Sequence, residues 1–149
     1  MLSSYMKILI PIDGSPHSKK ALKFAADLAL RYPAKLCILH VLHNSPGSDT
    51  TSLGAASVTI EADQEKLDES ARELLETAKK VATDMGCSDV ETIARGGHPT
   101  QQIIRCASKK GIDVIVLGSR GLSDIKGLLL GSVSHQVNNL AECTVVTVR

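Results

Sequence analysis

The chain has 149 residues, which is enough for one domain to bury roughly 70% of its unfolded surface, so we expect a single domain over residues 1–149. Its formal net charge of +1 offers no field that would attract nucleic acid or an anionic membrane. One Phe, two Tyr and no Trp leave almost no aromatic surface on which bases could stack, which also argues against a nucleic-acid partner.

The beginning of the chain predicts a strand, a turn and a helix. The run MKILIPI (6–12) is short, apolar and rich in Ile, as buried strands are, and it breaks at Asp13 and the following glycine. Ser15 followed by Pro16 is typical of a helix start, because Ser caps a free N–H and Pro has none to cap. Apolar residues then recur at helical spacing and predict a helix over residues 16–32.

The next part of the chain predicts a second strand, a long loop and a long helix. The run KLCILHVL (35–42) indicates the strand. Residues 43–59 show little periodicity and many small or polar side chains, so we interpret them as a loop, and a loop of this length suggests a lid. An apolar stripe over residues 67–85 then predicts an amphipathic helix, with Gly86 as its C-cap.

The remaining elements continue the alternation. Strands are predicted at residues 88–94, 113–118 and 144–148, and helices at residues 99–110 and 133–141. Strands that alternate with helices favour a parallel, doubly wound five-stranded α/β sheet with helices on both faces. The chain contains neither a domain boundary nor an internal repeat.

Glycines follow the fourth predicted strand, in the stretch GSRGLSDIKGLLLGS. In doubly wound sheets, ligands bind beyond the carboxyl ends of the strands where the winding reverses, and in the common order 3-2-1-4-5 the first and fourth strands meet there. Gly118 and Gly121 would let main-chain N–H groups approach an anion, and Gly131 and Ser132 stand at a helix start, which suits a phosphate. The pattern favours a nucleotide ligand. The alternative is that these glycines only shape a turn.

The spacing of these residues resembles the nucleotide-binding signature of the universal stress protein family. GSRG, nine further residues and GS match that family's pattern of Gly, two residues, Gly, nine residues, Gly and Ser or Thr. The runs ILIPIDGS, LHVL, GGHPTQQII, DVIVLGSRG and GSVSHQV extend the resemblance over nearly the whole chain. It implies an adenine nucleotide alpha-hydrolase-like fold with strand order 3-2-1-4-5. It also implies binding of ATP, or of AMP or ADP.

The resemblance further implies which residues contact the nucleotide. Pro11 and Asp13 would contact the ribose and the adenine edge, and Val41 would pack on the base, with Leu117 beside it. The phosphates would be held by residues of the turn and helix start: Gly118, Ser119, Arg120, Gly121, Gly131, Ser132, Val133 and Ser134. Any Mg²⁺ would be held mainly by the nucleotide's phosphates, so we expect neither a protein-built metal site nor a catalytic residue.

The last predicted strand is a candidate dimer contact. The family often has Cys-Pro before it, whereas this chain has Cys143 followed by Thr144. The run TVVTV, from Thr144 to Val148, would be an exposed sheet edge with little protection against pairing. The resemblance implies a homodimer, and pairing through this edge would cover it.

The cysteines and the N-terminus are typical of a protein that stays in the cytoplasm. The cysteines are scattered without CxxC spacing, which favours buried free thiols over a metal or redox site: Cys37, Cys87, Cys106 and Cys143. The N-terminus lacks the pattern of a secretory signal, and no apolar run approaches the length of a membrane span. We therefore expect a cytoplasmic protein without a membrane partner.

Other polar residues near the turns carry weaker indications. His40 and His43 are three apart near a strand end, where a period of two puts them on opposite faces, which argues against a metal pair. Asp113 precedes its strand and would not reach the crevice. The others are expected at a helix entry or on the surface: His98, His135, Asp124 and Lys126.

Three functions are compatible with these features. The first is an ATP-binding regulator or sensor in the stress response, which needs phosphate donors but no base. The second is a slow ATPase or nucleotide transferase, for which the sequence has only fragments of the required cation, metal carboxylate and nucleophile-orienting group. The third is a nucleotide-free interaction protein. We rank binding above turnover and expect at most weak ATP hydrolysis.

Overall fold

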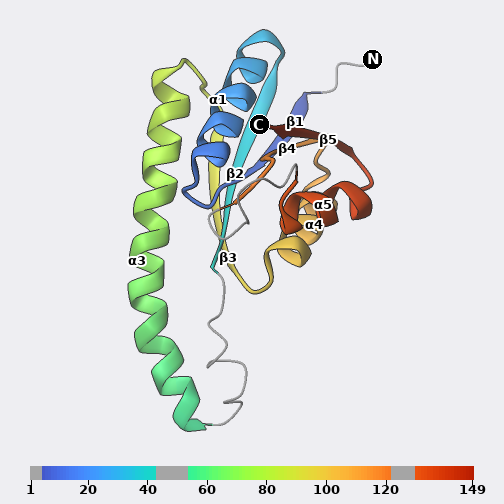
Figure 1. Cartoon of the computed structure of the whole chain (residues 1–149). Coiled ribbons are helices and arrows are strands. Elements are labelled where there is room, and N and C mark those ends of the chain that lie inside the picture. The colour runs from blue at the N-terminus through green and yellow to red at the C-terminus, as the bar shows by residue number, and fades with distance from the viewer. Residues whose placement is uncertain (1–4, 43–53, 122–129) are drawn as a thin grey trace.

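The computed structural model describes residues 5–42, 54–121 and 130–149, and for residues 54–68 it describes the backbone alone. Strands and helices alternate along the chain (Figure 1). The strands are β1 (Met6–Pro11), β2 (Ala34–Leu42), β3 (Val90–Gly96), β4 (Val114–Gly118) and β5 (Thr144–Val148). The helices are α1 (Pro16–Arg31), α3 (Gly54–Asp84), α4 (Pro99–Lys110) and α5 (Ser132–Leu140). This succession confirms the predicted order of elements.

All five strands pair in parallel, in the order β3-β2-β1-β4-β5, as predicted. β1 is the central strand, and its Ile8 lies opposite Leu36 of β2 on one side and Val114 of β4 on the other. The chain winds outward from β1 through β2 to β3, then returns to the far side of β1 to form β4. The winding therefore reverses between β1 and β4, and the turns that follow these two strands flank one crevice.

Helices cover both faces of the sheet, and each face has its own core. α1 and α3 lie on one face, and α4 and α5 lie on the other (Figure 1). Ile8 and Ile10 of β1 pack with residues of α1 and α3, whereas Leu9 between them packs with residues of α4 and α5. All three side chains are fully buried. Burial on both faces explains why this stretch is apolar at successive positions, without polar alternation.

The signals for helix ends in the sequence act as expected. Ser15 is the N-cap of α1, and its Oγ accepts a hydrogen bond from the Ser18 N–H at 3.2 Å, while Pro16 begins the helix. α4 ends at Gly111, whose φ of 63° lies in the left-handed region that favours glycine. At these two helix ends, the residues that the sequence marks as caps have cap geometry in the structure.

The loop predicted over residues 43–59 is wrong in its second part, because α3 begins at Gly54. Residues 43–53 lie outside the described residues. The first part of α3 extends past the carboxyl ends of β2 and β3 (Figure 1). A helical segment that leaves the sheet has no core to face, so it needs no apolar stripe, and the periodicity used for prediction is missing there. Within the described segments, no helix is both long and apolar enough to cross a membrane.

All four cysteines are free, as predicted. Cys37, Cys87 and Cys106 are buried and Cys143 is half-buried. Burial raises the pKa of each thiol, and for Cys37, where the carboxylate of Glu91 adds to the effect of burial, the pKa rises to about 11. These thiols are protonated at neutral pH and belong to the core.

Gly118 at the end of β4 marks the closest approach between the sheet and α1. An ideal Cβ built on Gly118 would lie 2.7 Å from the carbonyl carbon of His17 and 2.9 Å from the backbone nitrogen of Ser18. We therefore expect Gly118→Ala to destabilise the protein by about 1–3 kcal/mol, because the added methyl group pushes α1 away from β4. In thermal unfolding, each kcal/mol corresponds to a loss of about 2–4 °C in Tm.

Gly96 offers a matched control for this substitution. It ends β3, as Gly118 ends β4, but a Cβ built on it meets nothing within 4 Å. We expect Gly96→Ala to leave Tm nearly unchanged. Equal melting temperatures for the two variants would contradict the close approach at Gly118.

Candidate functional site

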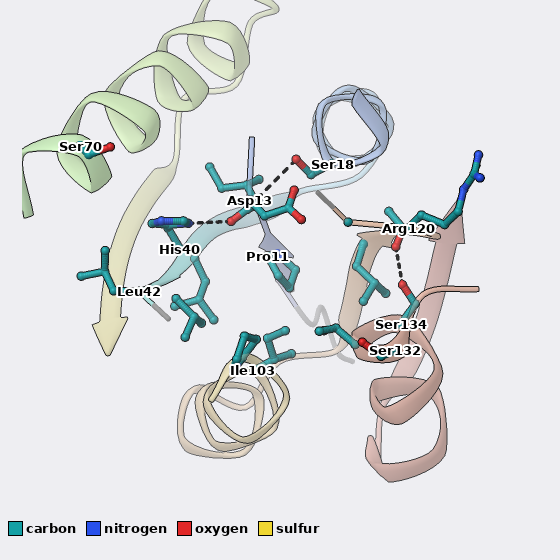
Figure 2. A pocket seen from close by; sticks show the side chains of 18 residues that line it. Pro11, Asp13, Ser18, His40, Leu42, Ser70, Ile103, Arg120, Ser132 and Ser134 are labelled. Carbon is teal, nitrogen blue, oxygen red and sulfur yellow. Dashed lines mark hydrogen bonds between the residues drawn. The ribbon is translucent and has the colours of Figure 1, made fainter. Parts of the chain in front are cut away.

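A cleft of about 360 Å³ opens at the carboxyl ends of β1, β2 and β4. This is the position predicted from the reversal of winding, and the volume lies within the range of small-molecule sites. Figure 2 shows the side chains that surround the cleft. The lining residues are Pro11, Ile12, Asp13, Ser18, Leu39, His40, Val41, Leu42, Ser70, Pro99, Ile103, Leu117, Gly118, Arg120, Gly121, Ser132, Val133 and Ser134.

One side of the cleft is apolar. β2 contributes Leu39, Val41 and Leu42, and α4 contributes Pro99 and Ile103 across from them. Figure 2 shows Leu42 and Ile103 on this side, with Pro11 of β1 between them and the opposite end. Such a wall favours a flat apolar group over a charged one, because burying an unpaired charge there would be costly.

The opposite side of the cleft is polar and suits an anion. The end of β4 and the following turn contribute Gly118, Arg120 and Gly121, and the first turn of α5 contributes Ser132 and Ser134. The N-cap of α5 is a glycine, which has no side chain to cap the helix. The N–H groups of the first turn and the positive end of the helix dipole therefore face this side, and the first turn contains no acidic residue.

Ser134 ties the first turn of α5 to the end of β4. Its Oγ donates a hydrogen bond to the Gly118 carbonyl oxygen at 2.5 Å, and its side chain is buried. This bond joins two segments that are 16 residues apart in the chain. The spacing between the turn and the helix start is therefore set before any ligand arrives.

Asp13 stands in the turn between β1 and α1, and that turn is well ordered by hydrogen bonds. Its Oδ1 accepts from the Ser15 N–H at 2.9 Å, and its own N–H donates to the Ser18 Oγ at 3.4 Å. Gly14 has a φ of +84°, which only glycine adopts readily, and this lets the chain reverse between strand and helix. The carboxylate of Asp13 is thus held at the middle of the cleft (Figure 2).

His40 connects β2 to the end of β1. Its Nδ1 lies 2.9 Å from the carbonyl oxygen of Ile12. Because a carbonyl oxygen only accepts, Nδ1 carries the hydrogen in this bond. In the sequence, the spacing of His40 and His43 argues against a metal pair and gives His40 no other role. His43 lies outside the described residues. The structure places His40 in the wall of the cleft.

Ten of the twelve residues predicted to contact a ligand line the cleft: Pro11, Asp13, Val41, Leu117, Gly118, Arg120, Gly121, Ser132, Val133 and Ser134. Ser119 and Gly131 lie behind them. The buried Ser119 donates its N–H to the Val148 carbonyl oxygen at 2.7 Å and accepts from the Gly131 N–H at 2.6 Å. These two residues connect β5, the turn and α5, and so support the residues that face the cleft.

Position 118 requires glycine for a second reason, which cannot be recognised in the sequence. We expected it to let main-chain N–H groups approach an anion. In the structure, the space that its Cβ would fill is taken by the backbone of His17 and Ser18. The close packing of α1 on β4 therefore requires glycine at this position, whether or not an anion binds.

Several lining residues were missed by the sequence analysis: Ile12, Ser18, Leu39, His40, Leu42, Ser70, Pro99 and Ile103. Half of them are apolar residues of β2 and α4, which in the sequence are indistinguishable from core residues. Ser70 comes from α3, whose position against the cleft depends on how that helix crosses the sheet. The only usable signal was proximity to the predicted strand ends.

The remaining candidates lie away from the cleft or outside the described residues. His98 is the N-cap of α4 and borders a separate hollow between α4 and α5, and His135 is exposed. Asp113 precedes β4 and accepts a hydrogen bond from the Lys7 N–H at 2.9 Å. It therefore lies at the amino end of β4, whereas the cleft lies at the carboxyl ends of the strands. Asp124 and Lys126 are not among the described residues. Within the described parts of the chain, no three His, Cys, Asp or Glu side chains are grouped to hold a metal ion.

Comparisons with known proteins agree with this architecture. A model of the universal stress protein family matches residues 4–149. Universal stress protein YxiE of Bacillus subtilis (strain 168) is 38% identical over 148 residues, 97% of this chain and 99% of that protein. The solved structure of the protein MJ0577 is 30% identical, with a TM-score of 0.84 over 97% of this chain and 95% of that chain.

A second solved structure adds a ligand. A universal stress protein in complex with cAMP is 26% identical to this chain, with a TM-score of 0.75 over 99% of both chains. The family match and the relatives extend over nearly the full length of the chain, including the segments that build the cleft. The chain belongs to the universal stress protein family.

Proposed function

We propose that the cleft binds an adenine nucleotide, ATP in particular, and that the protein acts as a nucleotide-dependent regulator in the stress response. The observation that carries this proposal is the division of one cleft into an apolar side, from β2 and α4, and an anion-attracting side at the first turn of α5. A nucleotide has the same division between its base and its phosphates. The complex of a related universal stress protein with cAMP supports an adenine nucleotide as the ligand class.

The proposed contacts follow from the position of each residue around the cleft. Val41 and Ile103 pack on the two sides of the base, and Pro11 and Asp13, at the middle, contact the ribose and the adenine edge. The phosphates lie against Gly118, Arg120, Gly121 and the first turn of α5: Ser132, Val133 and Ser134. A Mg²⁺ ion that accompanies ATP binds through the phosphates, since the proposed site includes no protein-built metal centre.

Side chains added at the start of α5 test the phosphate end. Gly131 has φ −75° and ψ 171°, a conformation open to any residue, so a double variant Gly131→Val, Ser132→Val fits the backbone. Ser132 lines the cleft, so the branched side chain at position 132 blocks the approach to the first-turn N–H groups, while the one at position 131 alters the N-cap behind it. We expect ATP affinity to fall by at least about tenfold, as measured by calorimetry with magnesium present, since removal of charge-assisted hydrogen bonds costs this much.

Asn139→Val provides the control. It places the same side chain on α5 at an exposed position outside the cleft, and it should bind ATP as the wild type does. Unchanged ATP affinity in the double variant would show that the phosphates bind elsewhere. Chromatography of nucleotide released from the purified protein identifies the natural occupant, and ADP release at saturating ATP separates a sensor from a slow hydrolase.

The proposed function includes a homodimer formed through β5. This strand pairs with β4 on one side and is the last strand of the sheet. The Val148 carbonyl oxygen accepts from Ser119, and in a parallel ladder alternate residues point the same way, so Val145 and Thr147 direct their N–H groups outward. Val145, Val146 and Val148 are only half-buried within the single chain. A second copy of β5 would pair with the open edge and cover this apolar surface.

Val145→Pro tests this contact, because it removes one outward N–H and leaves the hydrogen bonds to β4 in place. We expect the dimer to dissociate at about tenfold or more higher protein concentration than the wild type, as measured by sedimentation velocity. Val145→Thr retains both the N–H and the branched side chain and should stay dimeric. A wild-type monomer at every concentration, or a dimer unaffected by the proline, would place the contact elsewhere or exclude it.

A further inference from the structure

Arg120 lines the cleft, but its charged group is directed away from it. In Figure 2 the side chain leads from the turn after β4 and points away from Pro11 and the centre of the cleft. Its Nη2 lies 3.4 Å from the Nε2 of His17, the second residue of α1. His17 itself is half-buried and is not among the residues that line the cleft. The guanidinium is therefore held outside the cleft by a residue 103 positions earlier in the chain.

The chemistry of the two groups determines the direction of this hydrogen bond. A guanidinium has five donors and no acceptor, so Nε2 of His17 must accept. The ring is then neutral, with its hydrogen on Nδ1. The contact is a hydrogen bond from a cation to a neutral acceptor, which is weaker than the same cation makes with a phosphate.

The acceptor is held on a rigid support. The backbone of His17 fills the space beside Gly118, so close that a Cβ there would meet its carbonyl carbon at 2.7 Å. Arg120 follows Gly118 by two residues, and the turn between them is tied to α5 through Ser134. The structure thus fixes the separation between His17 and the base of Arg120 at both ends, and only the long side chain of Arg120 lies between them.

The surroundings favour release of the guanidinium when an anion arrives. The N-termini of both α1 and α5 carry the positive end of a helix dipole, and the first turn of each contains no acidic residue. A cation placed near the start of α1 is not stabilised by that dipole. A phosphate at the start of α5 would offer it an opposite charge within the cleft that Arg120 already lines.

We propose that His17 is a positioning residue that holds Arg120 outside the empty cleft and releases it to the phosphate chain of the ligand. This inference deepens the proposed nucleotide function and rests on it for the identity of the natural ligand. Because a phosphate-bearing ligand must break the bond between Arg120 and His17 before it gains the guanidinium, the presence of this bond lowers the affinity for such ligands. It does not affect a ligand without phosphates. His17 thereby sets how strongly the protein distinguishes ATP from adenosine.

Two substitutions of His17 separate the hydrogen bond from the packing. His17→Phe keeps a ring of similar size without an acceptor, and His17→Gln places an amide oxygen near the position of Nε2. Calorimetry would measure the affinity of the wild type and of each variant for ATP, adenosine and inorganic tripolyphosphate. We expect His17→Phe to bind ATP and tripolyphosphate about three- to tenfold more tightly than the wild type, the range set by one net hydrogen bond, and adenosine equally well. His17→Gln should resemble the wild type.

Arg120→Ala completes a double-mutant cycle. It should weaken binding of ATP and tripolyphosphate, and in this background His17→Phe should have no further effect, because the released group is gone. A gain that persists without Arg120, equal changes for all three ligands, or weaker ATP binding by His17→Phe would overturn the inference. So would tripolyphosphate that binds to no variant. Tripolyphosphate could show the expected pattern while neither ATP nor adenosine has a higher affinity than tripolyphosphate. In that case the proposed nucleotide function fails and the role of His17 stands.

Discussion

The structure depends on β1, which is buried on both faces and paired on both sides. Ile8, Leu9 and Ile10 expose no surface, so this strand connects the two cores and cannot move without disturbing both. Its central place also forces the chain to leave for β2 and return for β4, which creates the reversal of winding. The cleft is a consequence of that arrangement, because the turns that follow β1 and β4 lead to opposite faces of the sheet and leave a gap between them.

The two sides of the cleft arise from different physical causes. The apolar side is made of side chains, from β2 and α4, that continue the core to the surface. The polar side depends largely on backbone, because a glycine N-cap leaves the start of α5 without a capping side chain, and the turn after β4 brings further main chain close to it. A ligand with an apolar ring at one end and a multiple negative charge at the other meets both conditions.

The glycines in the signature allow close packing of the chain as well as the approach of a ligand to the main-chain N–H groups. Gly118 allows α1 to touch the end of β4, and this contact places His17 beside the turn that carries Arg120. Gly131 allows the first turn of α5 to face the cleft without a cap, while its N–H secures the turn through Ser119. A substitution in the signature therefore acts on packing and on the cleft together, so the thermal stability of such a variant has to be measured beside its ligand affinity.

Local signals were enough to predict most of the fold. Strand and helix types and the N-cap at Ser15 followed from hydrophobic periodicity and capping signals, since each is decided within a few residues. The sheet order was expected as the common order of doubly wound sheets and from the family resemblance, and the structure has it. The start of α3 was missed because a helix that leaves the sheet needs no apolar stripe. The spaced glycines likewise indicated where the cleft would form.

Tertiary structure decided the rest of the site. Leu39 and Ile103 resemble core residues in the sequence, and only the crossing of α4 over β2 brings them to one wall. The supporting places of Ser119 and Gly131, and the contact of His17 with Arg120, depend on segments that are distant in the chain. The sequence alone determined the elements, their succession along the chain and the end of the strands at which a ligand would bind. Which side chains face that ligand was decided only when helices packed on the sheet, because burial and contact depend on long-range geometry.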